Sequence, residues 1–238
     1  MNRLTGILVI VCLTIFCSCV ATKQAKSKKV KGSGFMSPEI YAMMEDGNRE
    51  ELEAARRYVS KDIDWHKYNK IQLDPVVLFT GPGDEGTGGI SQEDTQKILD
   101  YFFNKLHKSI EDSPNLEIAH APGPDTLRMQ FAVVDLGKSH VTMGAISTYI
   151  PQIGLITSVA TMASDKPAFV GEMGIEFKIT DSSTGKIVAA GMDKRYGGKK
   201  LGKGTDSWKD VFNIIDYYVE LLGFRVCRMQ ERENCERP

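Results

Sequence analysis

The chain has 238 residues, a formal net charge of -1 at pH 7, 42% hydrophobic and 26% charged residues. These values are ordinary for a globular protein and exclude a collagen-like or low-complexity chain. The near-zero net charge argues against a strongly basic nucleic-acid-binding protein, so no nucleic acid is expected as a partner. Without the export and tether segments described below, roughly 170–200 residues remain, about one domain.

The first 18 residues have the form of a secretory signal. Arg3 supplies a positive charge, and the apolar run from Ile7 to Phe16 is shorter than a permanent membrane span. The run ends at Cys17-Ser18-Cys19, where a small residue directly precedes a cysteine. This arrangement resembles the lipobox of bacterial lipoproteins. Residues 1–18 are therefore predicted to be a lipoprotein signal peptide, and Cys19 the diacylated first residue of the mature chain.

Two other interpretations of this terminus stay open, because Phe16 stands where a lipobox usually has Leu. Cleavage after Ala21 would release a soluble protein, and an uncleaved signal would retain the chain as an anchor. Val20, not Asp, follows the cysteine. In a host with two membranes, the lipoprotein sorting rule then favours a location in the outer membrane, with the domain facing the periplasm.

Residues 19–34 are predicted to be a disordered tether. Five lysines lie between positions 23 and 31, and no acidic residue occurs before Glu39. Such a segment buries too little apolar area to fold. Its positive charge attracts it to anionic lipid head groups, with about 1 kcal/mol of binding free energy for each lysine near the surface. The alternative is a plain solvated linker.

Residues 35–238 are predicted to form a single periplasmic domain with a C-terminal tail. A short helix is expected after Ser37-Pro38, because a capping serine followed by proline starts helices. Residues 50–59 fit a helix, although the stretch from Arg56 to Ser60 fits a strand equally well. Residues 70–79 are predicted as a strand that is broken at Pro75.

Two long amphipathic helices are predicted. Ser91 with Asp94 forms a cap for a helix to about Ile110, and Asp206 or Ser207 caps a final helix. In each helix the apolar residues recur at helical spacing and define one core-facing stripe. The stripes are Ile98, Leu99, Phe102, Phe103, Leu106 and Ile110 in the first helix, and Trp208, Val211, Phe212, Ile215, Tyr218, Val219 and Leu222 in the second.

The remaining strands are predicted at residues 116–119 and 126–136 and in a β-hairpin. The hairpin joins residues 168–180 to residues 186–196 through the turn Asp181-Ser-Ser-Thr-Gly185. Together these elements predict an α/β (α+β-like) two-layer domain, in which a mixed four- or five-stranded sheet packs against the two long amphipathic helices.

Residues 141–164 contain no charged side chain and are interrupted by Pro151. They are too polar for a membrane span. One interpretation is a buried connection followed by a helix of small residues; the other is a surface for self-association or for an envelope protein partner. The candidate interaction residues are Tyr149, Ile150, Ile153, Leu155 and Ile156.

Two of the five cysteines, Cys227 and Cys235, remain after signal removal and lipidation. An exported protein meets an oxidising compartment, so these two thiols are expected to form a disulfide. Two free thiols are the alternative. A metal site is not expected, because two thiols with no nearby histidine supply too few ligands.

No catalytic residue, cofactor or nucleotide is expected. Residues 197–205 approach a phosphate loop, but Gly204 stands where Ser or Thr must bind Mg²⁺. No Gly-x-Ser-x-Gly elbow occurs. The histidines share no spacing to Asp, Ser or each other that favours catalysis or metal binding; they are His66, His107, His120 and His140.

Several short phrases along the domain line up with a known family: Ser33-Gly-Phe-Met-Ser37, Trp65-x-x-Tyr68 before Leu73-Asp-Pro-Val76, Lys166-Pro-Ala-Phe-Val-Gly171, and Asp181-x-x-Thr-Gly185. As a set they resemble a family of bacterial lipoproteins known only as a domain of unknown function. The resemblance runs from about residue 33 to residue 225. It implies a lipid-anchored envelope protein and supplies no catalytic residues.

We therefore expect a non-enzymatic, lipid-anchored protein of the bacterial envelope that acts as a binding or assembly accessory. The first alternative is a binder of a small ligand or of cell-wall glycan, with the glycine-rich loops at 81–89 and 197–204 as its rim. The second is a hydrolase with an unrecognised site.

Overall fold

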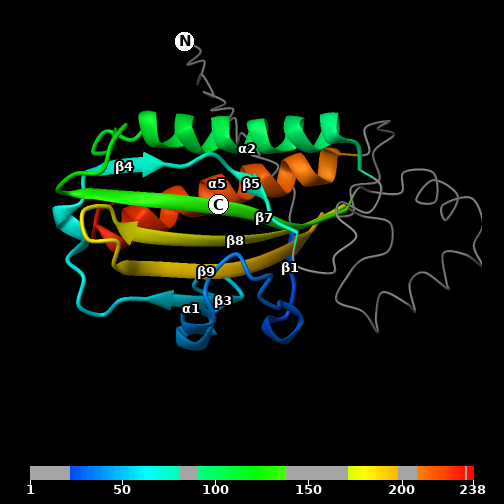
Figure 1. Cartoon of the computed structure of the whole chain (residues 1–238), viewed down its shortest axis with the longest axis horizontal. Helices are drawn as coiled ribbons and strands as arrows, with labels where there is room; N and C mark the ends of the chain where they lie inside the picture. The colour runs from blue at the N-terminus through cyan, green and yellow to red at the C-terminus, as the bar shows by residue number, and fades with distance from the viewer. Residues whose placement is uncertain (1–21, 81–89, 138–170, 198–207, 234) are drawn as a thin grey trace, which may run out of the picture.

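The structure is a computed structural model that describes residues 22–80, 90–137, 171–197, 208–233 and 235–238. Within these residues the chain forms one mixed β-sheet with two long helices on one face (Figure 1). The predicted α/β (α+β-like) class is confirmed. The sheet holds nine strands where four or five were predicted, because two-residue segments with no readable periodicity pair along its edges.

Three long antiparallel strands form the centre of the sheet: β7 (Thr126–Gly137), β8 (Glu172–Asp181) and β9 (Ile187–Tyr196). The predicted hairpin is confirmed as β8 and β9. The outer strands are β1 (Lys23–Gln24), β2 (Glu45–Asp46), β3 (Arg56–Val59), β4 (Lys70–Leu73), β5 (Val77–Leu78) and β6 (Glu117–Ile118). The order is β2-β3-β9-β8-β7-β4-β6, with β1 also beside β9 and β5 also beside β7.

The two predicted long helices are α2 (Gln92–Glu111) and α5 (Lys209–Met229). The Ser91 hydroxyl accepts a hydrogen bond from the Asp94 amide at 3.0 Å, as the cap predicted. The caps predicted for α5, Asp206 and Ser207, lie outside the described residues. The described residues also form three short helices: η1 (Ser27–Lys29), α1 (Pro38–Met43) and η2 (Trp65–Lys67).

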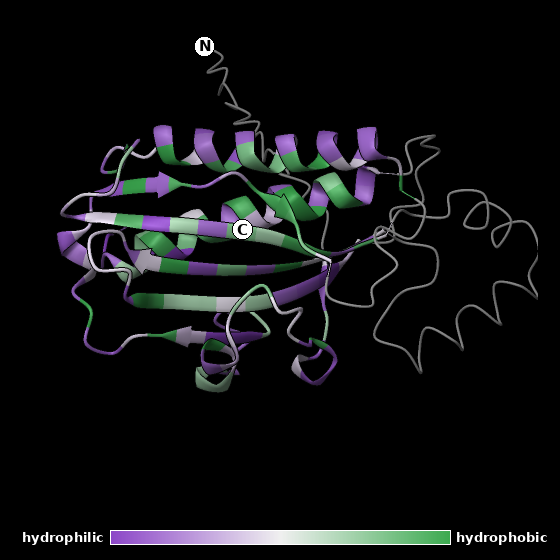
Figure 2. Ribbon diagram, in the orientation of Figure 1, coloured by the Kyte–Doolittle hydropathy of each residue, from purple (hydrophilic) through white to green (hydrophobic). Residues whose placement is uncertain are grey.

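The main core lies between the helices and one face of the sheet. Because side chains alternate along a strand, Met173, Ile175 and Ile179 of β8 all point to this face and pack in the core. Every residue of the two predicted helical stripes belongs to the same core or packs against it. Figure 2 shows the hydrophobic side of α2 turned toward the sheet.

The opposite face of the sheet is partly covered by residues 33–44. Glu176 of β8 is fully buried there. Its carboxylate accepts hydrogen bonds from the Ser33 amide at 2.7 Å and from the Tyr41 hydroxyl at 2.5 Å. Burial, and then this hydrogen bond, raise the pKa of Tyr41. The Ser33-Gly-Phe-Met-Ser37 phrase is thus held on the sheet by a buried acid.

The expected tether at residues 19–34 is wrong for residues 22–34. Lys23 and Gln24 pair with Tyr196 and Arg195 of β9 as strand β1, and Ala25 is fully buried. Composition predicted disorder because the lysines dominate it. The C-terminal half of β9, with which this segment pairs, is identified as its partner only in the tertiary structure.

The turn between β8 and β9 is organised by Asp181. One carboxylate oxygen accepts hydrogen bonds from the amides of Ser183 and Thr184 at 3.1 and 2.9 Å. The other accepts the hydroxyl of Tyr68 at 2.8 Å. These bonds, that of Tyr68 foremost, lower the pKa of Asp181 to about 2. The Asp-x-x-Thr-Gly and Trp-x-x-Tyr phrases therefore meet in space.

Asp181 predicts an acid-sensitive contribution to stability. Since its folded pKa is about 2 and its ordinary pKa is 3.8, the carboxylate stabilises the fold above about pH 4, and this contribution is lost as the pH falls toward 2. Between about pH 5 and pH 2, the free energy of unfolding measured in urea should fall by about 1–2 kcal/mol more for the unmodified protein than for Asp181→Asn. Asp62→Asn, at an exposed acid, is the control and should follow the unmodified protein. Equal acid dependence in all three proteins would contradict the assignment.

Candidate functional site

A cavity of about 500 Å³ lies between the sheet and the two helices. This volume falls in the range of roughly 300–1,000 Å³ found for small-molecule sites. Most of its lining is apolar, although Tyr68, Tyr218 and Arg225 also line it. The apolar residues include Met129, Phe131, Ile175, Ile179 and Ala189 from the sheet, Phe102 and Leu106 from α2, and Leu222 and Val226 from α5.

Strand β9 has small residues beside the cavity, and Ala189 lines it. Ala189 and Gly191 lie opposite Val59 and Arg57 of β3. A Cβ atom on Gly191 would lie only 2.5 Å from the Phe177 ring, so glycine is required for that ring to lie where it does. The Phe177 ring thus occupies the space beside Gly191, and the small side chain of Ala189 is what β9 contributes to the helix-facing wall of the cavity.

Polar side chains gather at the mouth of the cavity. Glu51, Glu53, Arg57, Arg228 and Gln230 all contribute to its lining. Arg57 Nε lies 2.7 Å from a carboxylate oxygen of Glu53, and Arg228 Nη1 lies 3.2 Å from one of Glu51. The Arg228 and Glu51 side chains are 58% and 54% exposed. The mouth thus carries both signs of charge and opens to water.

The mouth loop, residues 47–55 between β2 and β3, supplies Glu51 and Glu53 to the cavity mouth and contains one strained backbone position. Leu52 has a φ of 57°, a left-handed conformation that bulky side chains rarely adopt. The guanidinium of Arg225 on α5 donates two hydrogen bonds to the Leu52 carbonyl, the one from Nε at 3.0 Å. Burial lowers the pKa of Arg225. Helix α5 therefore holds the mouth loop in this shape.

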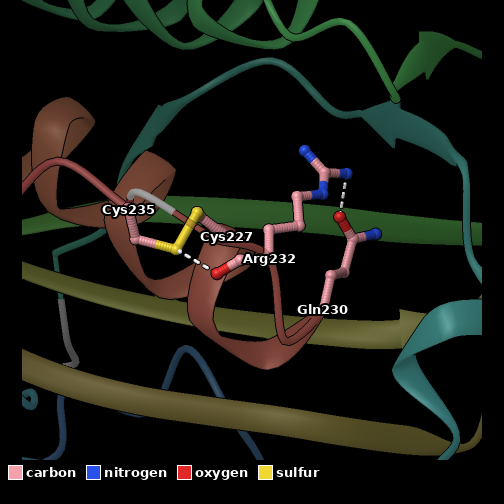
Figure 3. Close-up of a disulfide and its surroundings, with 4 residues drawn as sticks. All are labelled: Cys227, Gln230, Arg232 and Cys235. Carbon is pink, nitrogen blue, oxygen red and sulfur yellow. Dashed lines mark hydrogen bonds between the residues drawn. A yellow bond between two sulfur atoms is a disulfide. The ribbon is translucent and has the colours of Figure 1, made fainter.

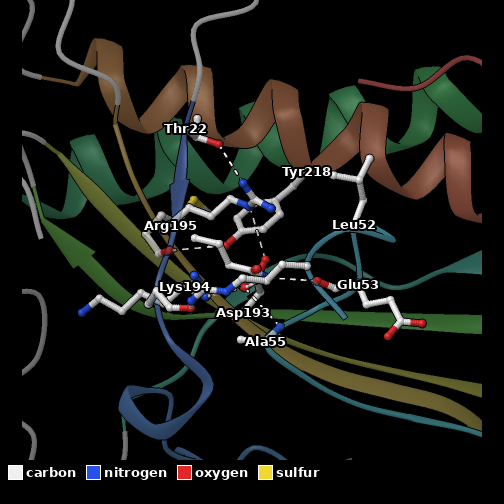
Figure 4. A network of polar contacts seen from close by, with 12 residues as sticks. Thr22, Leu52, Glu53, Ala55, Asp193, Lys194, Arg195 and Tyr218 are labelled. Atoms are coloured by element: carbon white, nitrogen blue, oxygen red, sulfur yellow. Dashed lines mark hydrogen bonds and ion pairs between the residues drawn. The ribbon is translucent and has the colours of Figure 1, made fainter. Parts of the chain in front are cut away.

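A buried polar network lies beside the mouth (Figure 4). The Asp193 carboxylate accepts hydrogen bonds from the Gln24 side chain at 2.8 Å and from the Ala55 amide at 3.3 Å. The Gln24 side chain also donates to the Glu53 carbonyl at 2.9 Å. Burial raises the pKa of Asp193, and the charge on Arg195 opposes that shift. One carboxylate therefore joins β1, β9 and the mouth loop.

Arg195 is the buried cation of this network. Its Nε lies 3.3 Å from the Asp193 carboxylate, and its Nη1 donates to the Thr22 hydroxyl at 3.0 Å. The guanidinium also stacks over the Tyr217 ring of α5, 4.0 Å from the ring centroid. Burial raises the pKa of the neighbouring Tyr218 well above its ordinary value. Arg195 thereby links the N-terminal segment to α5.

The disulfide expected between Cys227 and Cys235 is present (Figure 3). Cys227 lies on α5 between Val226 and Arg228, both of which line the cavity. The tail beyond α5 is tied down at two further points. Gln230 donates to the Tyr68 carbonyl at 3.0 Å, and Arg237 donates to the Glu50 carbonyl. The tail therefore borders the mouth on the side of α5.

Several sequence-predicted residues cannot be placed, because they lie outside the described residues. These are Cys19, the glycine-rich loop at 81–89, most of the loop at 197–204, His140, and the interaction residues Tyr149, Ile150, Ile153, Leu155 and Ile156.

The three described histidines are dispersed, with His66 in η2, His107 in α2 and His120 after β6. In the part of the chain that the structure describes, no three side chains of the metal-binding types come together. No helix in that part is long and apolar enough to cross a membrane.

The cavity itself was not predicted. The signal in the sequence is Ala189-Ala190-Gly191, a run of small residues inside a predicted strand. In the structure these residues pair with larger residues of β8. Glycine within a strand marks close approach of another group. The run does not show, however, whether a neighbouring side chain or a ligand occupies the space.

Solved structures similar to this chain include two PelC dodecamers from Paraburkholderia phytofirmans, one of a variant in space group C2 and one in space group P6. Their TM-scores are 0.38 and 0.36, and their identities 12% and 13%. In both cases the alignment covers 75% of this chain and 97% of the other. Among curated proteins, no sequence matches.

The phrases that run from Ser33 to Gly185 all fall within the part of the chain that a family model matches, residues 31–222. The resemblance to a family of unknown function is confirmed by this match, while the lipid anchor stays a prediction. The chain belongs to the family described as a protein of unknown function, DUF3313.

Proposed function

We propose that this protein is a lipid-anchored cell-envelope protein whose domain binds a small apolar ligand between the sheet and the helices. The observation that carries the proposal is the cavity of about 500 Å³, with its apolar walls and charged mouth. An apolar ligand gains about 25 cal/mol for each Å² of apolar surface that it buries. Empty apolar space in a core destabilises a fold, so a ligand in this cavity would also stabilise the protein.

The apolar walls favour this ligand over the alternatives. A cell-wall glycan carries many hydroxyl groups, and each would need a hydrogen-bond partner on burial, which the walls lined by Met129, Phe131 and Leu222 do not supply. A hydrolase would need a nucleophile and a base at the cavity. Among the described residues its lining contains no His, Ser, Cys or Asp, and its two glutamates, Glu51 and Glu53, form ion pairs with arginines at the mouth.

The location in the envelope is supported by residues 1–19 and by the disulfide. A signal of this form directs export, and disulfides persist in oxidising compartments. The Cys227–Cys235 bond of the structure agrees with such a compartment. An envelope protein partner remains a further proposal that residues 141–164 motivate, because they are uncharged throughout.

Filling the cavity should abolish ligand binding. Leu222→Trp replaces a leucine that lines the cavity by a bulky indole ring. The control, Phe212→Trp, changes the same helix at a partly buried position outside the cavity. With N-phenyl-1-naphthylamine as a neutral fluorescent probe, we expect Leu222→Trp to bind at least about tenfold more weakly. Phe212→Trp should bind as the unmodified protein does.

Thermal unfolding of both variants distinguishes a filled cavity from a damaged fold. Leu222→Trp should unfold within a few degrees of the unmodified protein, because the added ring occupies existing space. If the unmodified protein takes up no probe, or if the folded Leu222→Trp variant takes it up equally well, the cavity is not the ligand site.

The anchor has its own test. Replacing Cys19 with Ala removes the thiol that is acylated, so the protein should move from the membrane fraction to the soluble periplasmic fraction on fractionation of cells. A Cys12→Ala variant, changed within the predicted signal, should stay with the membrane. Persistence of Cys19→Ala in the membrane fraction would refute the anchor.

A further inference from the structure

We infer that the ligand is the hydrocarbon chain of a bilayer lipid, and that the N-terminal anchor holds the mouth of the cavity beside the membrane from which the lipid comes. This inference rests on the proposed function above. It names the ligand's chemical class and the direction from which the ligand reaches the site.

The distribution of polarity in the cavity fits an amphiphile. The depth is lined by aromatic and aliphatic side chains such as Phe102, Phe131 and Ile175, and the ionised side chains Glu51, Arg57 and Arg228 stand at the mouth. A hydrocarbon chain gains about 0.8 kcal/mol for each CH₂ group that it buries. Its polar head would remain at the mouth, where both signs of charge are available.

The anchor lies close to the folded domain. The Thr22 hydroxyl accepts a hydrogen bond from Arg195, and three peptide units separate Cys19 from Thr22. Three residues span at most about 11 Å when fully extended. An acylated Cys19 therefore keeps this corner of the domain within about one head-group layer of the bilayer.

The mouth of the cavity lies in the same part of the domain, next to Thr22 and β1. The Gln24 side chain donates to the Glu53 carbonyl at 2.9 Å, and Arg49 Nη2 donates to the Ala25 carbonyl at 2.6 Å. Figure 4 shows Thr22, Leu52 and Glu53 around one network. Because the mouth loop bonds directly to β1, the membrane-proximal strand and the mouth cannot be far apart.

The charge of the adjoining segment favours the same orientation. Lys23, Lys28 and Lys31 are exposed on and after β1. Lysines near a bilayer attract anionic head groups by about 1 kcal/mol each. The segment predicted as a tether thus lies on the domain and presents its lysines near the anchor.

Photo-crosslinking in vesicles tests the inference. The acylated full-length protein would be reconstituted into vesicles of phosphatidylethanolamine and phosphatidylglycerol that contain a phosphatidylcholine with a diazirine on its acyl chain. After illumination, crosslinked peptides are mapped by mass spectrometry. We expect crosslinks on the cavity-lining segments of β7 and α5, reduced at least about fivefold in Leu222→Trp and retained in Phe212→Trp.

A second variant tests the role of the anchor without touching the cavity. Insertion of about ten Gly and Ser residues after Ala21 adds roughly 17 Å of average reach. We expect cavity crosslinks to fall at least about threefold in this variant, while its binding of N-phenyl-1-naphthylamine stays unchanged. Equal crosslinking with and without the insertion would overturn the role of the anchor.

The outcomes separate the two proposals. If the neutral probe binds but crosslinks appear only on residues 22–31, the protein touches the bilayer without taking up a chain, and the inference is wrong while the proposed function stands. If the same diazirine chain reaches the cavity only when supplied as a free fatty acid, the bilayer source is wrong. If neither probe nor lipid enters, both proposals fail.

Discussion

The carboxylate of Asp193 joins the N-terminal strand β1, the central strand β9 and the loop at the cavity mouth. It lies on β9 and accepts hydrogen bonds from β1 and from the loop that forms the cavity mouth, while Arg195 beside it reaches Thr22 and Tyr217. Removing one partner of a buried ion pair costs about 3–5 kcal/mol, because the other charge stays buried without compensation. This buried charge therefore supports the position of the N-terminal segment, the shape of the mouth and the packing of α5.

The two faces of the sheet carry different parts of the structure. On one face, α2 and α5 supply apolar stripes that close over β7, β8 and β9, and Ala189 of β9 lines a cavity between these helices and the sheet. On the other face, buried Glu176 holds residues 33–41. N-terminal to residues 33–41, the chain pairs with β9 as strand β1. An anchor at Cys19 would therefore act on the edge that borders the cavity mouth.

The regular elements were predictable because their signals are local. The Ser91 cap, the two helical stripes and the hairpin turn at Asp181 are each specified within one turn of helix or a few residues of strand. The Cys227–Cys235 disulfide followed from compartment and count. The tether prediction failed because composition describes what a segment can bury alone, whereas Lys23 and Gln24 are ordered by hydrogen bonds to a strand about 170 residues later.

The sequence by itself determined the α/β class, the positions of the long helices, the hairpin and the pairing of the last two cysteines, because periodicity and turn chemistry act between near neighbours. Only the tertiary structure decided that β1 pairs with the C-terminal half of β9, that Tyr68 meets Asp181, and that Ala189 lines a cavity between the sheet and the helices. These features depend on which distant side chains face one another. That is set by strand register and helix packing, and no local pattern encodes either of them.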